Sequence, residues 1–298
     1  MKKKRAAIMC SQGLGDGIIY SMIAYNLYLI GYEVTVYSQK LLGLKSWFPN
    51  QIIKPYVTKE EWDNTLNLYD IVVIQPGALP YTKFQLIPKT LPKHVLFMHN
   101  HEFDYKKSLV ANLLDALKTR FKCQYPTRYN GISPPQNRSP ARYSKRVVIH
   151  ATSGEEFRNW PVKKYEDIAR YITKTGYEPV FVMCSNERKE FLNQNPSFKY
   201  QVPDFANLDE LTGFIYESKY FIGNDSGLGH LASSLGLPTI TLFHSPKIRH
   251  FWRPGWSKNY NVCPLPILFK YKWQKRFWKH FLFPFQVIDK FKKMIDNS

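Results

Sequence analysis

The sequence predicts an α/β protein with two doubly wound domains that face a cleft. First, short apolar runs, typical of parallel strands buried on both faces, alternate with segments of helical spacing along the 298 residues. Second, this alternation occurs twice, on either side of a proline-rich stretch near the middle of the chain. Third, small polar loops containing glycine follow three of the predicted strands, where such folds bind ligands.

The first series of elements begins near the amino terminus. A strand is predicted over Arg5–Cys10, followed by a loop and by helical spacing from Gly17 to about Leu29. Gly31 ends this helix, and Glu33–Tyr37 resumes as a strand. The series continues with two apolar strands and one helix, over Asp70–Gln75, His94–Met98 and Leu109–Leu117.

The middle of the chain differs in composition. Between Leu117 and Arg146 there are eight Lys or Arg, four prolines and no Asp or Glu. The proline-rich part is interpreted as an interdomain linker. This predicts an amino-terminal domain over residues 1–125, a linker over 126–143 and a carboxy-terminal domain over 144–298.

The second series begins with a strand over Arg146–His150. A helix over Val162–Thr175 follows and is opened by Pro161, which is well suited to the first turn of a helix. The remaining elements alternate strand, helix, strand, helix, strand, over Pro179–Cys184, Leu208–Tyr216, Tyr220–Gly223, Ser226–Leu235 and Pro238–Phe243.

Composition excludes several classes of protein. Hydrophobic residues make up 44% and aromatic residues 16% of the chain, which is enough for a packed core and excludes intrinsic disorder. The 42 Lys and Arg exceed the 23 Asp and Glu by 19. We therefore expect a polyanionic partner or an acidic surface.

The distribution of apolar residues and cysteines bears on the compartment. No run approaches the roughly 18 apolar residues of a membrane span, and the apolar stretch after Met1–Arg5 is too short for a secretory signal. The four cysteines lie far apart without a CxxC pair. We therefore expect reduced thiols, no structural zinc and a cytoplasmic location.

The first loop that could carry chemistry is Ser11–Gly17. Gly13, Gly15 and Gly17 alternate in it and permit a tight turn. Asp16 lies where the helix is predicted to begin, so one interpretation is a helix N-cap. The other is a carboxylate that acts as a general base.

The second loop is His150–Pro161. Thr152 and Ser153 offer hydroxyl groups, and Arg158 offers a cation that can bind an anion through two hydrogen bonds. Together they would suit a diphosphate. The alternative is a surface loop with a solvated arginine.

The third loop is Gly223–Ala232. A strand ends here and a helix starts, so the free N–H groups of the first helical turn form a potential anion site. Asp225 is interpreted either as a helix cap or as an acceptor for sugar hydroxyls. His230 is either part of this site or a satisfied core histidine.

These loops resemble the motifs of a known family. The stretch Ile222–Pro238 (IGNDSGLGHLASSLGLP), with the apolar Thr239–Phe243 after it, closely resembles the signature of the ADP-heptose lipopolysaccharide heptosyltransferases, glycosyltransferase family 9. His150–Pro161 resembles the diphosphate loop of that family, and Gly15–Ile18 resembles its amino-terminal Gly-Asp motif. The three matches occur in the family's order.

The resemblance implies a GT-B fold with two Rossmann-like domains. The amino-terminal domain would hold the acceptor beside the glycine loop of Gly13, Gly15 and Gly17, and Asp16 would be the catalytic base. The carboxy-terminal domain would hold the nucleotide sugar. Its donor-binding residues would be Thr152, Ser153, Arg158, Asp225, Ser226, Gly227 and His230.

The implied roles on the donor side differ. Thr152, Ser153 and Arg158 would contact the diphosphate, and the backbone N–H groups of Ser226 and Gly227 would add to this. Asp225 would hold the donor sugar or ribose, and His230 would support the loop.

The implied reaction is inverting glycosyl transfer, with heptose moving from ADP-heptose onto a lipopolysaccharide core or a related glycan. No Asp-x-Asp metal-binding motif occurs in the chain. We therefore expect no metal and no cofactor besides the nucleotide-sugar co-substrate.

The carboxy-terminal third suggests contact with a membrane surface. Within Phe269–Phe283, aromatic residues including Trp278 interleave with Lys and Arg, a pattern that suits an anionic bilayer interface. We therefore expect peripheral contact with the cytoplasmic face of the inner membrane. The carboxy-terminal domain is predicted to end in such basic, aromatic helices. The alternative is that their aromatic side chains cover the domain junction while the Lys and Arg side chains stay solvated.

Three other functions stay open at this point. The charge also fits a non-catalytic nucleic-acid binder, although no nucleic-acid module is recognisable and we expect no nucleic-acid partner. A related transferase could use a UDP-linked sugar. An inactive homologue could bind a nucleotide sugar without turnover.

Overall fold

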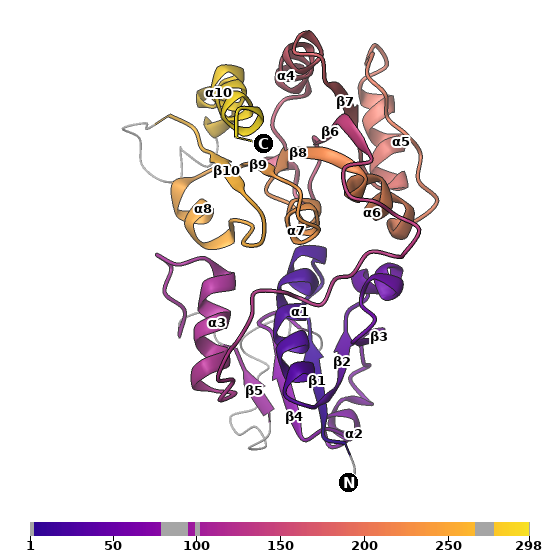
Figure 1. The fold of residues 1–298 in the computed structure, drawn as a ribbon, viewed down its shortest axis with the longest axis vertical. Coiled ribbons are helices and arrows are strands. Elements are labelled where there is room, and N and C mark those ends of the chain that lie inside the picture. The colour runs from indigo at the N-terminus through magenta and orange to yellow at the C-terminus, as the bar shows by residue number, and fades with distance from the viewer. Residues whose placement is uncertain (1–2, 79–94, 99–101, 266–276, 298) are drawn as a thin grey trace. The chain divides into compact units, whose positions relative to one another are not determined.

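A computed structural model describes residues 3–78, 95–98, 102–265 and 277–297. The chain divides into two compact units, Met1–Pro135 and Gln136–Ser298, and each contains one parallel sheet with helices around it (Figure 1). The predicted α/β architecture with two parallel sheets is confirmed.

Unit 1, as we call Met1–Pro135, has a five-stranded sheet in the order β3-β2-β1-β4-β5. Strand β1 is central and is buried except at its first residue, as expected from its continuous apolar run. Its strands are β1 (Arg5–Met9), β2 (Glu33–Tyr37), β3 (Ile52–Lys54), β4 (Ile71–Ile74) and β5 (Val95–Phe97). Its helices are α1 (Leu14–Leu29), the 3-10 segment η1 (Lys40–Trp47), α2 (Trp62–Leu66) and α3 (Leu109–Thr119).

Unit 2, as we call Gln136–Ser298, has the strand order β10-β9-β8-β6-β7. Its strands are β6 (Tyr143–His150), β7 (Glu178–Phe181), β8 (Ser218–Asn224), β9 (Thr239–Leu242) and β10 (Asn259–Val262). Its helices are the 3-10 turn η4 (Glu156–Arg158), α4 (Val162–Lys174), α5 (Ser185–Gln194), α6 (Leu208–Tyr216), α7 (Gly227–Ser234), α8 (Pro246–Trp252) and α10 (Pro284–Ile295).

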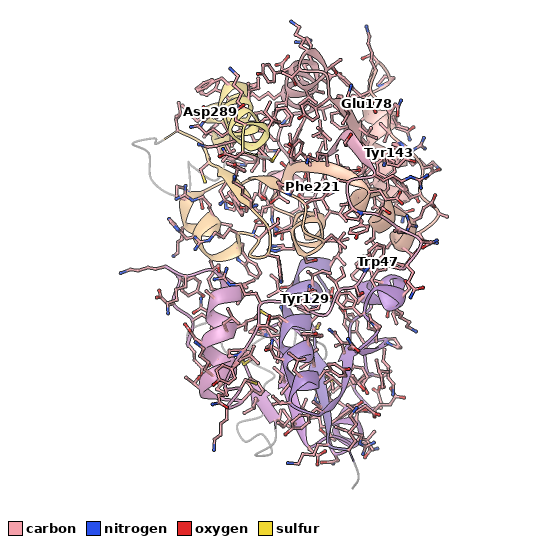
Figure 2. The ribbon with its side chains drawn as sticks, in the orientation of Figure 1. Trp47, Tyr129, Tyr143, Glu178, Phe221 and Asp289 are labelled. Carbon is pink, nitrogen blue, oxygen red and sulfur yellow. The ribbon has the colours of Figure 1, made fainter. Side chains whose placement is uncertain are left out.

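The core of unit 2 joins its sheet to the end of the chain. Strand β8 is central, and its Phe221 is fully buried (Figure 2). Trp278 and Phe291, from the carboxy-terminal segment, belong to the same apolar cluster as Trp160. Helix α10 packs against α4. The carboxy-terminal segment therefore completes the core of unit 2.

Much of the stretch predicted as a linker is packed against unit 1. The Asn130 side chain is fully buried and donates to the Ile18 carbonyl at 3.2 Å. Gln51 donates to the Asn130 carbonyl at 2.7 Å. Gly131 has a φ of +84°, and a Cβ there would lie 2.8 Å from the Tyr25 ring, so glycine suits this close approach. The division between the units falls after Pro135.

Seven elements of the described residues were not predicted from the sequence: η1, β3, α2, η4, α5, α8 and β10. Helix α5 has one buried residue, Phe191, so it lacks the apolar stripe by which helices are recognised. Among the helices in the described ranges, none is long and apolar enough to cross a bilayer.

Candidate functional site

The three loops predicted to carry chemistry follow strands at or beside the middle of their sheets. The first follows β1, the central strand of unit 1. The other two follow β6 and β8, which are neighbours in unit 2. His150 at the end of β6 pairs with Gly223 of β8, so these two loops leave the sheet side by side. Strand pairing therefore places the two loops that carry the predicted donor residues next to each other.

Asp16 lies in the first turn of α1 and is not its N-cap. The helix begins at Leu14, three residues before its predicted start, and Gly13 takes the capping position. The N-cap interpretation of Asp16 is therefore wrong. A carboxylate in the first turn is stabilised by the partial positive charge of the helix amino terminus. Asp16 keeps its carboxylate half-buried.

A buried glutamine that the sequence analysis did not single out fixes the Asp16 carboxylate. Gln75 lies directly after β4 and its Nε2 donates to Asp16 Oδ1 at 2.7 Å. Its Oε1 accepts a hydrogen bond from the Ser11 backbone N–H at 2.9 Å, so one side chain joins the loop and the carboxylate. The sequence feature that could have identified Gln75 is its place as a polar residue directly after a buried strand.

The glycines of this loop leave room for the carboxylate and for the packing of α1. A Cβ on Gly13 would overlap Asp16 Oδ2, and one on Gly17 would lie 2.9 Å from Leu41 Cγ. Gly15 lies within the first turn of α1. A larger residue at Gly13 would therefore displace Asp16.

The charge of Asp16 affects acidic groups around it. Burial raises the pKa of the Cys10 thiol well above its usual range, and the Asp16 carboxylate raises it further. Burial, the Cys10 thiol and Asp16 together raise the pKa of Tyr56 to about 12. The Cys10 thiol and the Tyr56 hydroxyl therefore stay neutral near pH 7.

In unit 2 the His150 imidazole joins both predicted donor loops. Its Nδ1 lies 3.0 Å from Ser226 Oγ, and its Nε2 lies 3.1 Å from Thr152 Oγ1. The Nε2 also lies 3.8 Å from a carboxylate oxygen of Glu187, at the start of α5. A chain of polar contacts thus runs from Glu187 through His150 to Ser226.

Glu187 is a second functional candidate that the sequence analysis missed. Burial would raise the pKa of its carboxyl group, but hydrogen bonds from His150, Cys184 N–H and Thr152, together with the charge on His150, lower that pKa below its ordinary value. The carboxylate accepts from Cys184 N–H at 3.1 Å. It is therefore a stable anion at neutral pH.

The loop after β6 is anchored to β8 by Asn224. Its Nδ2 donates to the Ala151 carbonyl at 2.8 Å. Its Oδ1 accepts from Trp160 N–H at 3.2 Å and from the Tyr165 hydroxyl at 2.8 Å. Because this amide is fully buried, both ends of the loop are held at fixed positions.

Between these anchors lie Ser153 and Arg158, two of the predicted diphosphate contacts. Ser153 Oγ donates to Asn159 Oδ1 at 2.7 Å. The Arg158 guanidinium lies 3.1 Å from the Glu155 carboxylate, and about a third of its side chain is exposed. Arg158 is thus paired within the loop and still accessible to a ligand.

The third loop places Asp225, Ser226 and Gly227 at the start of α7. Ser226 is the N-cap, and Gly227 begins the helix. Asp225 is largely buried, and its N–H donates to the Leu242 carbonyl at 3.0 Å. The first turn of α7 therefore follows directly on β8, as predicted.

His230 is a core histidine of α7. Its side chain is buried, and within the described part of the chain its Nδ1 has no hydrogen-bond partner. The Trp256 ring meets it edge to face. Burial lowers the pKa of His230 to about 4. This favours the interpretation of His230 as a core histidine.

This pKa predicts that unit 2 loses stability in acid. The imidazole titrates near its ordinary pKa of 6.5 in the unfolded chain and at about 4 in the folded one. Between these values the unfolded state binds more protons, so the stability contributed by neutral His230 is complete above pH 6.5 and lost as the pH falls to 4. At roughly 1.4 kcal/mol per pKa unit, the loss is about 3 kcal/mol.

Urea unfolding of His230→Leu against pH tests this. The variant should show a smaller fall in unfolding free energy between pH 7 and 4 than the wild type. His280→Leu, at an exposed histidine of unit 2, is the matched control and should follow the wild type. Parallel pH profiles for His230→Leu and the wild type would contradict the prediction.

The described part of the basic and aromatic segment packs on the donor loop. Trp278 is buried, and its Nε1 donates to the Phe157 carbonyl at 2.9 Å. Lys279 Nζ donates to the Glu156 carbonyl at 3.1 Å. Trp278 therefore does not contact a bilayer, and it packs within unit 2, so the domain-junction interpretation does not hold for it either. Residues 269–276 lie outside the described residues.

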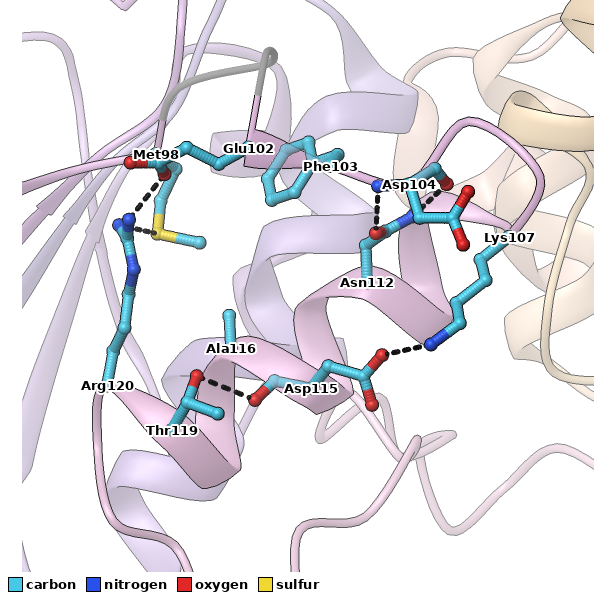
Figure 3. Close-up of a pocket in the computed structure, with 10 residues that line it drawn as sticks. All are labelled: Met98, Glu102, Phe103, Asp104, Lys107, Asn112, Asp115, Ala116, Thr119 and Arg120. Carbon is cyan, nitrogen blue, oxygen red and sulfur yellow. Dashed lines mark hydrogen bonds and ion pairs between the residues drawn. The ribbon is translucent and has the colours of Figure 1, made fainter.

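Unit 1 also contains a cavity of about 400 Å³ beside α3 (Figure 3). Arg120 forms an ion pair with Glu102 at its wall, and Lys107 forms one with Asp115 at 2.8 Å. The positive charges of Lys107 and Arg120 at this cavity are therefore each paired with a carboxylate. Within the residues that the structure describes, no group of three or more His, Cys, Asp or Glu could hold a metal ion.

In a comparison with known protein families, residues 93–276 match the model of "Glycosyltransferase family 9 (heptosyltransferase)". Among curated proteins, lipopolysaccharide heptosyltransferase 3 of Escherichia coli is 30% identical over 121 residues. That alignment covers 38% of this chain and 34% of the relative, so the matched segment spans about a third of its length.

Solved structures share the fold along the whole chain. A glycosyl transferase family 9 protein from Veillonella parvula superposes with a TM-score of 0.75 at 16% identity, covering 100% of this chain and 99% of that one. The E. coli ADP-heptose lipopolysaccharide heptosyltransferase II superposes with a TM-score of 0.67 at 14% identity, covering 99% and 100%. The predicted GT-B fold is confirmed by this likeness.

Proposed function

Because the chain belongs to glycosyltransferase family 9, we propose that it is an inverting glycosyltransferase that moves heptose from ADP-heptose onto a lipopolysaccharide core or a related surface glycan. The observation that carries this proposal is the meeting of two donor loops in unit 2. Strands β6 and β8 are neighbours, and Thr152 and Ser226 both contact His150. Hydroxyl groups and the first turn of a helix thus gather at one edge of the sheet, as an anionic donor requires.

In this proposal unit 2 binds the nucleotide sugar. The N–H groups at the start of α7 and the Arg158 guanidinium stabilise the negative charge that develops on the leaving ADP. Ser153 and Thr152 position the diphosphate, Gly227 leaves its backbone accessible, and Asp225 accepts hydrogen bonds from a sugar hydroxyl. An adenine-nucleotide donor is supported by the similar fold of the E. coli ADP-heptose lipopolysaccharide heptosyltransferase II.

Unit 1 supplies the base. The Asp16 carboxylate removes the proton from an acceptor hydroxyl as that oxygen attacks the anomeric carbon. Its hydrogen bond from Gln75 leaves the second carboxylate oxygen, Oδ2, over Gly13. The acceptor is an anionic glycolipid or glycan, in keeping with the net charge of +19. We propose that the protein works in the cytoplasm, at an anionic membrane face.

Calorimetric titration with ADP, UDP, GDP and CMP at one salt concentration tests the donor. ADP should bind selectively, and Arg158→Ala should weaken it about 10- to 100-fold because a charge-assisted hydrogen bond is lost. The control is Arg170→Ala on α4, where the arginine is likewise paired with an acid three residues away. Preference for UDP or GDP would contradict the ADP-heptose donor, and binding of none of the four would contradict the proposed function.

We also propose that transfer needs no metal ion. The N–H groups at the start of α7 and the Arg158 guanidinium can neutralise the charge of the diphosphate in place of a metal ion. Turnover of ADP-heptose should therefore be unchanged in excess EDTA. A loss of activity that Mg²⁺ or Mn²⁺ restores would show that a metal takes part.

A further inference from the structure

We propose that His150 is a positioning residue that decides which way the Ser226 hydroxyl donates its hydrogen bond, so that binding of the donor diphosphate is linked to a proton on the imidazole. This rests on the proposed function, because it assumes that the diphosphate binds at the start of α7. It adds a residue that does not itself touch the donor. The evidence is the geometry of three side chains around one buried ring.

Ser226 does not behave as an ordinary helix cap. A serine at this position usually accepts a hydrogen bond from the second or third N–H of the helix. Here the side chain makes no capping hydrogen bond, and its oxygen lies 3.0 Å from His150 Nδ1. Ser226 is half-exposed while the imidazole is buried, so the hydroxyl can meet a ligand that the ring cannot reach.

The other nitrogen of the ring has an acidic partner. His150 Nε2 lies 3.8 Å from the Glu187 carboxylate and 3.1 Å from Thr152 Oγ1. An anion on this side favours a proton on Nε2, which leaves Nδ1 of the neutral ring as an acceptor.

Two states of the hydroxyl follow. With neutral His150, the Ser226 O–H donates to Nδ1, and only oxygen lone pairs point toward the ligand. With protonated His150, Nδ1–H donates to Ser226 Oγ, and the hydroxyl hydrogen is free to bind a phosphate oxygen. A diphosphate therefore prefers the protonated ring, and by linkage its binding favours uptake of a proton by the imidazole.

The surroundings of the ring identify the charges that act on it. In the described part of the chain, Glu187 of α5 makes the ion-pair contact with the imidazole. From β8 the neighbour is the uncharged Phe221 ring, with centroids 6.5 Å apart. Asp225, next to Ser226, is the carboxylate at the end of β8, and Arg158 of the adjoining loop is paired with Glu155.

The experiment is a titration of the full chain with ADP between pH 5.5 and 8.5, for the wild type, His150→Asn and Ser226→Ala. Protonation of ADP itself affects all three proteins equally. The readout is therefore the difference between their profiles of ADP affinity against pH. As the pH rises from 5.5 to 8.5, the affinity of the wild type for ADP should fall about tenfold more than that of either variant. A hydrogen bond to a charged group typically contributes about a factor of ten or more to binding.

Two variants that each remove a carboxylate from α5 distinguish the contact between Glu187 and His150 from a general effect of charge. Glu187→Gln removes the anion that faces His150 Nε2 at 3.8 Å, so it should change the pH profile of ADP binding. Glu190→Gln removes the same charge from α5 at a residue that contacts Gln194, and it should leave the profile unchanged. A pH dependence retained in full by Ser226→Ala would overturn the role of the hydroxyl.

Nuclear magnetic resonance of the wild-type imidazoles provides a measurement that needs no folded His150 variant. At a given pH, saturating ADP should increase the ratio of doubly protonated to neutral His150 about tenfold, by the same linkage. ADP binding without this increase, or with equal pH profiles in wild type and His150→Asn, overturns this inference and leaves the proposed function standing. Failure of the wild type to bind ADP at any pH overturns both.

Discussion

Replacing Asp16 with asparagine is expected to lower the turnover number by about 10²–10⁴-fold at saturating substrates, because the acceptor hydroxyl loses its general base. Asparagine keeps an oxygen that can accept the hydrogen bond from Gln75, so the first turn of α1 should stay in place. The measurement is steady-state transfer from ADP-heptose to a lipopolysaccharide acceptor. The Kd for ADP, which belongs to unit 2 in the proposed function, should not change.

The matched control is Asp70→Asn. Asp70 also lies in unit 1 and also accepts a hydrogen bond at an element boundary, from Arg5 N–H at 2.7 Å, but it is exposed and outside the candidate site. It should retain wild-type turnover. A near-wild-type rate for Asp16→Asn would instead limit Asp16 to its favourable position at the helix amino terminus, which is worth about 0.3–1 kcal/mol.

Replacing Trp278 with alanine is expected to lower the unfolding free energy of unit 2 by about 3–5 kcal/mol. The side chain is buried in the same cluster as Trp160, and its loss leaves a cavity in that cluster. It also removes the hydrogen bond to the Phe157 carbonyl. Because Phe157 adjoins Arg158, the variant should in addition bind ADP more weakly. Urea unfolding and the calorimetric titration measure the two effects.

Two further variants divide this effect into its parts. Trp278→Phe keeps most of the apolar packing and loses the N–H group, so a loss of roughly 1–2 kcal/mol is expected. Phe285→Ala removes an aromatic side chain of the same segment that is 61% exposed, and it should change stability by less than about 0.5 kcal/mol. A Trp278→Ala variant as stable as Phe285→Ala would be inconsistent with its place in the core.

The elements that could be predicted from the sequence are those whose signal is local. Buried parallel strands produce continuous apolar runs, and β1, β2, β4, β6, β8 and β9 were recognised by them. Helix α5 was missed because Phe191 is its one buried residue, and the edge strand β10 because it is largely polar. Local periodicity records burial, so elements with little buried surface leave little trace in it.

Contacts between distant residues could not be predicted in this way. Gln75 is 59 residues from Asp16, and the two meet because β4 lies beside β1 in the sheet. Glu187 is 37 residues from His150, and they meet because α5 follows β7, the neighbour of β6. The sequence spacing of these pairs does not predict that their side chains are in contact.

The sequence by itself therefore determined the α/β class, the presence of two sheets and the loops that could carry chemistry, because apolar period, glycine and helix-start residues act over a few neighbours. The tertiary structure decided what each loop residue does. It made Gly13 and not Asp16 the helix cap, placed Trp278 in the core and turned Ser226 toward His150. Strand pairing sets these relations, because it brings together side chains that are far apart along the chain.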